Sequence, residues 1–192
     1  MTFDNNVATG TSTGSGCLAP DAGFASMIGY VSLAGRGRID DCLSRTVRLL
    51  EGEGWRLAGT VRKAPADIGA HPCDMDLRVL PDGPLLRISQ RLGSQARGCR
   101  LDGEAIENIA FEVEKRLDGA DALIVNKFGK QEGTGRGLCA AIATALETGI
   151  PVLVGVNALN LPDFVNFVGE PAQPLEPDPE TIRDWLASIS KR

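Results

Sequence analysis

The chain has 192 residues, 43% of them hydrophobic and 23% charged, which is ordinary for one globular domain with a sizeable core. Its net charge of −5 argues against broad binding of nucleic acid, which needs a basic face. No apolar run approaches the ~20 residues of a membrane span, and the N-terminus does not resemble a secretory signal. We therefore expect a cytoplasmic protein whose partners are neither nucleic acid nor membrane.

Short apolar stretches alternate with stretches of helical periodicity along most of the chain, which is typical of an α/β domain. The expected strands are at 24–35, 55–64, 73–80, 85–92, 122–125 and 152–156. The expected helices are at about 39–53, 104–117, 137–149, 161–169 and 181–192. We predict three layers around a mainly parallel sheet.

The predicted domain occupies residues 24–170. Residues 1–23 are rich in Gly, Ser, Thr and Asn, which predicts a disordered tail. The run Pro81-Asp82-Gly83-Pro84 is a strong turn signal and predicts an inserted β-hairpin at 73–92. Several prolines between 171 and 180 predict a link to a terminal helix, so that 171–192 form a C-terminal extension.

The number and spacing of the cysteines and of the histidine limit which disulfides and metal sites the chain can form. The five cysteines are scattered without a C-x-x-C pair, so free thiols are expected. The single histidine, His71, excludes sites that need two imidazoles. The spacing of His71, Cys73 and Cys99 matches no standard zinc pattern, so we predict no metal site.

A glycine turn, Gly35-Arg36-Gly37-Arg38, follows the first strand and precedes a helix. Nucleotide-binding proteins carry their phosphate loop at this place, with the pattern G-x-x-x-x-G-K-[ST]. That pattern is absent here, although the glycines and the helix N-terminus can still hold a small anion. The alternative is a tight turn followed by a helix that Asp40 or Asp41 caps.

Polar residues follow the apolar strand 122–125, where ligands gather in open α/β sheets. The candidate binding residues there are Asn126, Lys127, Gly129, Lys130, Glu132 and Arg136. The alternative is an ordinary strand-to-helix connection with solvated charges.

A second loop, at 93–102, carries Arg97, Gly98 and Arg100. Guanidinium groups suit phosphate and other oxyanions. Because both loops follow strand-like segments, we expect them to meet at the carboxyl edge of the sheet and form one anion site.

Several segments together resemble a bacterial family of domains of unknown function, which is itself similar to small P-loop nucleoside-triphosphatases. The resemblance covers roughly residues 26–168. It rests on the glycine turn at 35–37, on HPCDMDL, RISQRLG and ARGCRLD, and on LIVNKFGKQEGTGRG followed by GIPVLVGV. It implies a P-loop core and a link with molybdate or a related oxyanion, because such proteins are often described beside molybdate-transport components.

The chain departs from the related triphosphatases at two places. In them, the strand equivalent to 122–125 precedes an acidic pair and then Gly-Lys-x-Glu. This chain keeps Gly129, Lys130 and Glu132 but has Asn126 and Lys127 where the acidic pair would stand. Carboxylates at such positions organise magnesium and attacking water. The resemblance therefore implies the fold but not hydrolysis.

Three functions remain open. The first is binding of a phosphate-bearing ligand, such as a nucleotide or phosphate, or of a molybdate-like oxyanion, with little or no hydrolysis. The second is a divergent nucleoside-triphosphatase that needs magnesium, with Glu132 activating water and Lys130 or an arginine replacing the missing lysine. The third is a regulatory module that binds a protein partner or a second copy of itself.

Overall fold

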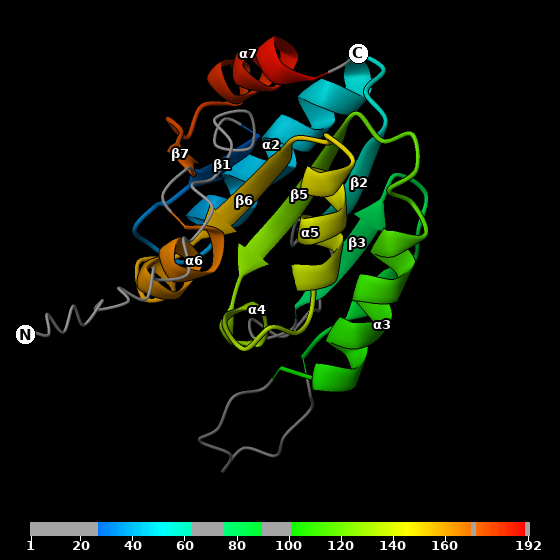
Figure 1. Cartoon of the computed structure of the whole chain (residues 1–192), viewed down its shortest axis with the longest axis vertical. Coiled ribbons are helices and arrows are strands. Elements are labelled where there is room, and N and C mark those ends of the chain that lie inside the picture. The colour runs from blue at the N-terminus through cyan, green and yellow to red at the C-terminus, as the bar shows by residue number, and fades with distance from the viewer. Residues whose placement is uncertain (1–26, 63–74, 90–100, 170–171, 191–192) are drawn as a thin grey trace, which may run out of the picture.

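The computed structural model describes residues 27–62, 75–89, 101–169 and 172–190 (Figure 1). The predicted tail 1–23, the residues His71, Cys73 and Cys99, and the loop residues Arg97, Gly98 and Arg100 lie outside the described residues. The strands are β1 (Ile28–Val31), β2 (Leu57–Arg62), β3 (Asp76–Leu80), β4 (Leu85–Arg87), β5 (Ala122–Phe128), β6 (Val152–Val156) and β7 (Gln173–Pro174). The helices are α2 (Arg38–Gly52), α3 (Gly103–Glu114), α4 (Lys130–Gly133), α5 (Cys139–Glu147), α6 (Leu161–Val168) and α7 (Pro179–Ile189).

The described strands form one sheet in the order β4-β3-β2-β5-β6-β1-β7. Five neighbouring strands, β2, β5, β6, β1 and β7, run parallel. The strands β3 and β4 are antiparallel additions beside β2. The predicted mainly parallel sheet is therefore confirmed. The predicted hairpin is present as β3 and β4, and it continues the main sheet rather than standing apart from it. The carboxyl ends of the parallel strands share one edge, where ligands gather in such sheets.

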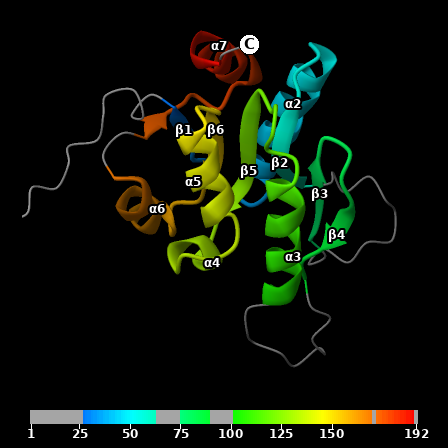
Figure 2. The same cartoon turned by 45° about the vertical axis from the view of Figure 1, so that its right-hand side comes forward.

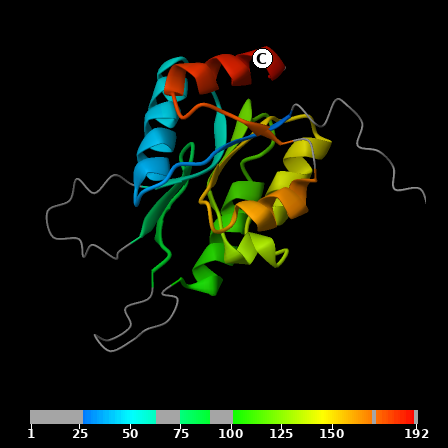
Figure 3. The ribbon, with the colours of Figure 1, turned by 90° about the vertical axis from the view of Figure 1, so that its left-hand side faces the viewer.

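Helices cover both faces of the sheet, which gives the predicted three layers (Figure 3). Side chains alternate along β5, so Leu123 and Val125 pack with buried residues of α3 and α5 on one face. Ala122 and Ile124 pack on the other face with buried residues of α2 and α7. In a view turned by 45°, α3 and α5 stand apart in front of the sheet, and α7 lies near α2 (Figure 2).

Helix ends follow from local chemistry, with one correction. Asp102 caps α3 as its position predicts, because its side chain accepts hydrogen bonds from the amides of Glu104 and Ala105. The expected cap of α2 by Asp40 or Asp41 is wrong. The N-cap is Gly37 at φ 82°, a left-handed conformation that glycine adopts at little cost, and no side chain caps this end. Asp40 is thereby free to turn into the protein.

Three other features differ from the expected elements. Strand β5 continues to Phe128 instead of ending at Val125, and the short helix α4 follows it at once. Two residues of the proline-rich segment pair with β1 as β7. Proline is tolerated there because β7 lies at the edge of the sheet. Within the described ranges, no helix is long and apolar enough to cross a membrane.

Helix α2 crosses the sheet so closely that β6 needs a glycine. A Cβ on Gly155 would overlap the carbonyl oxygen of Asn126 and lie 2.6 Å from Ile39 Cγ2. We expect Gly155→Ala to lower the free energy of unfolding by about 1–3 kcal/mol through overpacking. Urea denaturation measures this, with Gly52→Ala as the control, because a Cβ at Gly52 meets nothing within 4 Å. Equal stability of the two variants would contradict the close approach.

Candidate functional site

A cavity of about 310 Å³ opens at the carboxyl edge of the sheet, between the ends of β2 and β5 and the helices α3 and α4. Its polar end is lined by Asp40, Thr60, Arg62, Asn126, Lys127 and Lys130. Its apolar wall is formed by Met75, Leu77, Ile88, Leu101, Ile106 and Ile109. A larger open hollow of about 550 Å³ lies at the opposite edge, and none of the predicted site residues that the structure describes lines it. The first cavity is therefore the candidate site.

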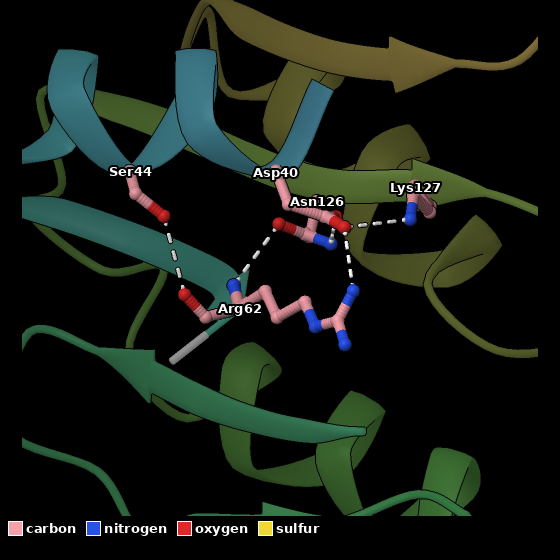
Figure 4. Close-up of polar contacts among 5 residues, drawn as sticks. All are labelled: Asp40, Ser44, Arg62, Asn126 and Lys127. Atoms are coloured by element: carbon pink, nitrogen blue, oxygen red, sulfur yellow. Dashed lines mark hydrogen bonds and ion pairs between the residues drawn. The ribbon is translucent and has the colours of Figure 1, made fainter. Parts of the chain in front are cut away.

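The carboxylate of Asp40 holds the polar end together (Figure 4). Its Oδ2 accepts hydrogen bonds from Arg62 Nη1 and Lys127 Nζ, both at 2.9 Å. Its Oδ1 accepts from Asn126 Nδ2 at 3.0 Å. The Asp40 side chain is 5% exposed. A charge buried to this extent is costly unless it is paired, and here three donors from two strands satisfy it.

Asn126 fits this position because it can donate and accept at once. Its amide nitrogen donates to Asp40, and its Oδ1 accepts from the backbone amide of Arg62 at 3.0 Å. The carbonyl of Arg62 in turn accepts from Ser44 Oγ at 3.2 Å, which joins the end of β2 to α2. The backbone pairing of β2 with β5 extends to Gly59 and Ile124. Beyond that point the Asn126 side chain continues the connection between the strands.

A β-bulge explains how two consecutive residues of β5 reach the same carboxylate. Val125 pairs with Val154, but Phe128 pairs with Val156, so β5 uses one residue more than β6 over this stretch. In a regular strand, Asn126 and Lys127 would point to opposite faces. The bulge redirects the chain, so that both side chains contact Asp40.

The pKa of Asp40 reflects these contacts. Burial alone would raise it, but the hydrogen bonds from Arg62, Lys127 and Asn126 and the charge of Lys127 together lower the pKa below its usual value. Asp40 is thus an ionised carboxylate whose charge is already balanced by its neighbours.

Glu132 has a different role from the one that its sequence pattern indicates. It is 6% exposed, and its two oxygens accept from the amides of Gly129 at 2.9 Å and Leu138 at 3.3 Å. Burial raises its pKa, against the effect of these hydrogen bonds. Its carbonyl accepts from the thiol of Cys139, whose pKa burial raises to about 11. Glu132 therefore holds the β5–α5 connection in shape.

The structure brings together part of the predicted set. Five of the predicted residues line the cavity: Asn126, Lys127, Gly129, Lys130 and Glu132. Arg136 is exposed and does not line it. The turn residues Gly35, Arg36 and Gly37 lie between β1 and α2, and Arg38 is the first residue of α2. None of the four lines the cavity, and Gly35 has φ 103°.

Sequence reasoning missed Asp40 and Arg62 as site residues, and it missed the apolar wall. Asp40 had the pattern of a helix cap, and Arg62 that of a charge at the end of a strand. The available signal was that Arg62 ends the expected strand 55–64 and Asp40 begins the helix after the first strand, both near the edge where ligands gather. Among the described residues, no group of three or more His, Cys, Asp and Glu could hold a metal ion.

The first prediction from the site concerns Asp40. Asp40→Asn should lower the free energy of unfolding by about 1–3 kcal/mol at pH 7, less than for a fully buried pair, because the Arg62 and Lys127 side chains are 21% and 39% exposed. Because folding lowers the pKa of Asp40, its stabilisation is present above the unfolded pKa of about 3.9 and is lost as pH falls through the folded value.

Urea denaturation of both proteins between pH 7 and pH 2 measures this difference. The control is Asp41→Asn, which removes the same charge from the exposed neighbouring residue of α2. A stability difference that is independent of pH, or that equals the difference for Asp41→Asn, would contradict the role assigned to Asp40.

The second prediction concerns Glu132. Glu132→Ala leaves two backbone amides without their acceptor, which should cost about 2–4 kcal/mol of unfolding free energy. Glu132→Gln should cost less, because one amide oxygen remains to accept. Thermal and urea unfolding measure both, with the exposed Glu147→Ala on α5 as the control. If Glu132→Ala is as stable as Glu147→Ala, the structural role is wrong.

Comparison with known proteins agrees with this fold. The chain superimposes on a human cancer-related nucleoside triphosphatase, solved in solution, with a TM-score of 0.56 and 15% sequence identity, over 84% of this chain and 96% of that one. At this identity the likeness concerns the fold alone. The expected resemblance to the core of a small nucleoside-triphosphatase is confirmed at that level.

Comparison of the sequence gives one relative and a family. The molybdenum import ATP-binding protein ModC 2 of Bradyrhizobium diazoefficiens is 30% identical over 155 residues, which cover 80% of this chain but 17% of that relative. The family described as "Protein of unknown function (DUF2478)" matches residues 28–185, most of the chain. The match spans every described strand and the first part of the last helix, α7. The chain therefore belongs to this family of unknown function, as its sequence motifs indicated.

Proposed function

We propose that the protein binds a phosphate-bearing ligand or a small oxyanion in the cavity at the carboxyl edge, with little or no hydrolysis. The observation that carries this proposal is the excess of positive charge at the polar end. Arg62, Lys127 and Lys130 line this end. The carboxylate at the same end, that of Asp40, already forms ion pairs with Arg62 and Lys127. A ligand that supplies negative charge completes such a site.

The same contacts argue against magnesium-assisted hydrolysis. Magnesium is held by carboxylate oxygens and waters. Both Asp40 oxygens already accept from side chains, and the oxygen of Asn126 accepts from the amide of Arg62. Lys127 adds a positive charge that repels a cation. A divergent triphosphatase would need Glu132 to activate water, but both of its oxygens accept from backbone amides.

The relatives suggest which anions to test. One relative is a molybdenum import ATP-binding protein, so molybdate is the candidate oxyanion and an adenine nucleotide is a candidate phosphate-bearing ligand. Because this chain matches 17% of that relative, the relative's transport role is not carried over.

The test is calorimetric titration with phosphate, molybdate, AMP and ATP, each with and without magnesium. At least one anion should bind without magnesium, and ATP should release phosphate no faster than in buffer. Lys127→Gln should weaken anion binding by about ten- to a hundredfold, because a charge-assisted hydrogen bond contributes roughly 1.5–3 kcal/mol. Arg56→Gln is the matched control, since Arg56 is exposed at the opposite edge of the sheet.

Thermal melting establishes that both variants remain folded. Equal binding by Lys127→Gln and Arg56→Gln would contradict the site. Magnesium-dependent release of phosphate from ATP would contradict the claim about hydrolysis and favour the divergent triphosphatase.

A further inference from the structure

The cavity is amphipathic, and its two ends impose different demands on a ligand. Six apolar side chains from the hairpin, from α3 and from the residues beside them form one wall. Of these, Ile88 and Ile109 are nearly fully buried at 8% and 2% exposure. A hydrated inorganic anion would occupy the polar end and leave this wall in contact with water. An apolar group attached to the anion would cover it instead.

The size of the cavity limits that apolar group. At about 310 Å³ the cavity lies at the lower end of the range of about 300–1,000 Å³ for small-molecule sites. This favours a ligand with one compact apolar part over an extended cofactor.

The charge of the cavity limits the anionic part. Among the residues that the structure describes, three cationic side chains line it (Arg62, Lys127 and Lys130), against two carboxylates (Asp40 and Glu132). With both carboxylates ionised, the lining carries one excess positive charge. One phosphate group, which carries about −1.5 to −2 charges at pH 7, matches this excess better than a chain of phosphates does.

The glycine turn lies apart from this arrangement. Arg36 and Arg38 do not line the cavity, although the turn stands at the usual place of a phosphate loop. The lining of the cavity thus includes side-chain cations but no residue of the turn.

We propose that the ligand is a small organic monophosphate whose apolar body lies against the wall formed by α3 and the hairpin. Its phosphate lies at the polar end, near Lys127 and Lys130. This inference rests on the proposed function and narrows it, from any phosphate-bearing ligand or oxyanion to a phosphate that carries an apolar group.

Phenyl phosphate is a suitable probe of this ligand class, because it joins one phosphate to one compact ring. Calorimetric titration of the full chain should give an affinity for phenyl phosphate about tenfold or more above that for inorganic phosphate. Phenol, which lacks the charge, and ATP, which carries three phosphates, should both bind more weakly than phenyl phosphate.

Two variants on α3 test whether the apolar wall contributes to binding independently of the cationic end. Ile106→Ser removes part of the apolar wall and should weaken binding of phenyl phosphate by about three- to tenfold, with inorganic phosphate unaffected. Phe111→Ser is the control, because Phe111 is 58% exposed on the same helix and does not line the cavity. Lys127→Gln should weaken binding of both anions.

The outcomes distinguish this inference from the proposed function. Equal affinities for phenyl phosphate and inorganic phosphate, or tighter binding of ATP, would overturn the inference and leave anion binding intact. Equal effects of Ile106→Ser and Phe111→Ser on phenyl phosphate would also overturn it. Absence of binding for phosphate, molybdate, AMP, ATP and phenyl phosphate would overturn the proposed function itself.

Discussion

One buried carboxylate determines how the candidate site is built. Asp40 lies in the first turn of α2, after a left-handed glycine at the N-cap, and it is buried. Once there, its charge must be balanced, since an unpaired carboxylate in this environment would cost several kcal/mol. Arg62 at the end of β2 and two residues of β5 supply the balance. The interaction therefore ties α2 and β2 to the distant strand β5, and it fixes the shape of the carboxyl edge.

The same balance decides what the edge can bind. The resemblance to small P-loop triphosphatases implies an acidic pair after the strand equivalent to β5, where carboxylates would attract a metal. Here an amide and an ammonium group occupy the corresponding positions, and the carboxylate that remains comes from α2. An amide can donate to a carboxylate and so permits the contact that a second carboxylate would disrupt by repulsion. Asn126 and Lys127 are therefore chemically consistent with Asp40, and the three residues form one arrangement, as the proposed anion site requires.

The fold was largely predictable, whereas the site was predictable only in part. Strands such as 152–156 are short apolar runs, and burial on both faces gives parallel strands that signature. The end of β5 was missed because Asn126 and Lys127 are polar, and a bulge that turns two consecutive side chains toward one partner leaves no periodicity. Arg62 was missed because its partner Asp40 is 22 residues away. Such pairings are set by the crossing of α2 over the sheet, which local sequence does not encode. The loop with Arg97 and Arg100 stays a prediction.

The position of the cations has a consequence for selectivity. A phosphate loop binds through backbone amides, whose positions are fixed by the fold and whose geometry selects the anion. At this cavity the positive charge comes instead from the side chains of Lys127, Lys130 and Arg62, and both lysines are exposed. Exposed ammonium groups attract many anions with little geometric discrimination, and salt weakens that attraction. The rigid part of the cavity is its apolar wall, where Ile88 and Ile109 are held in the core. In the proposed site, discrimination among anions would then come from the apolar part of the ligand that contacts this wall, while the lysines would supply the attraction.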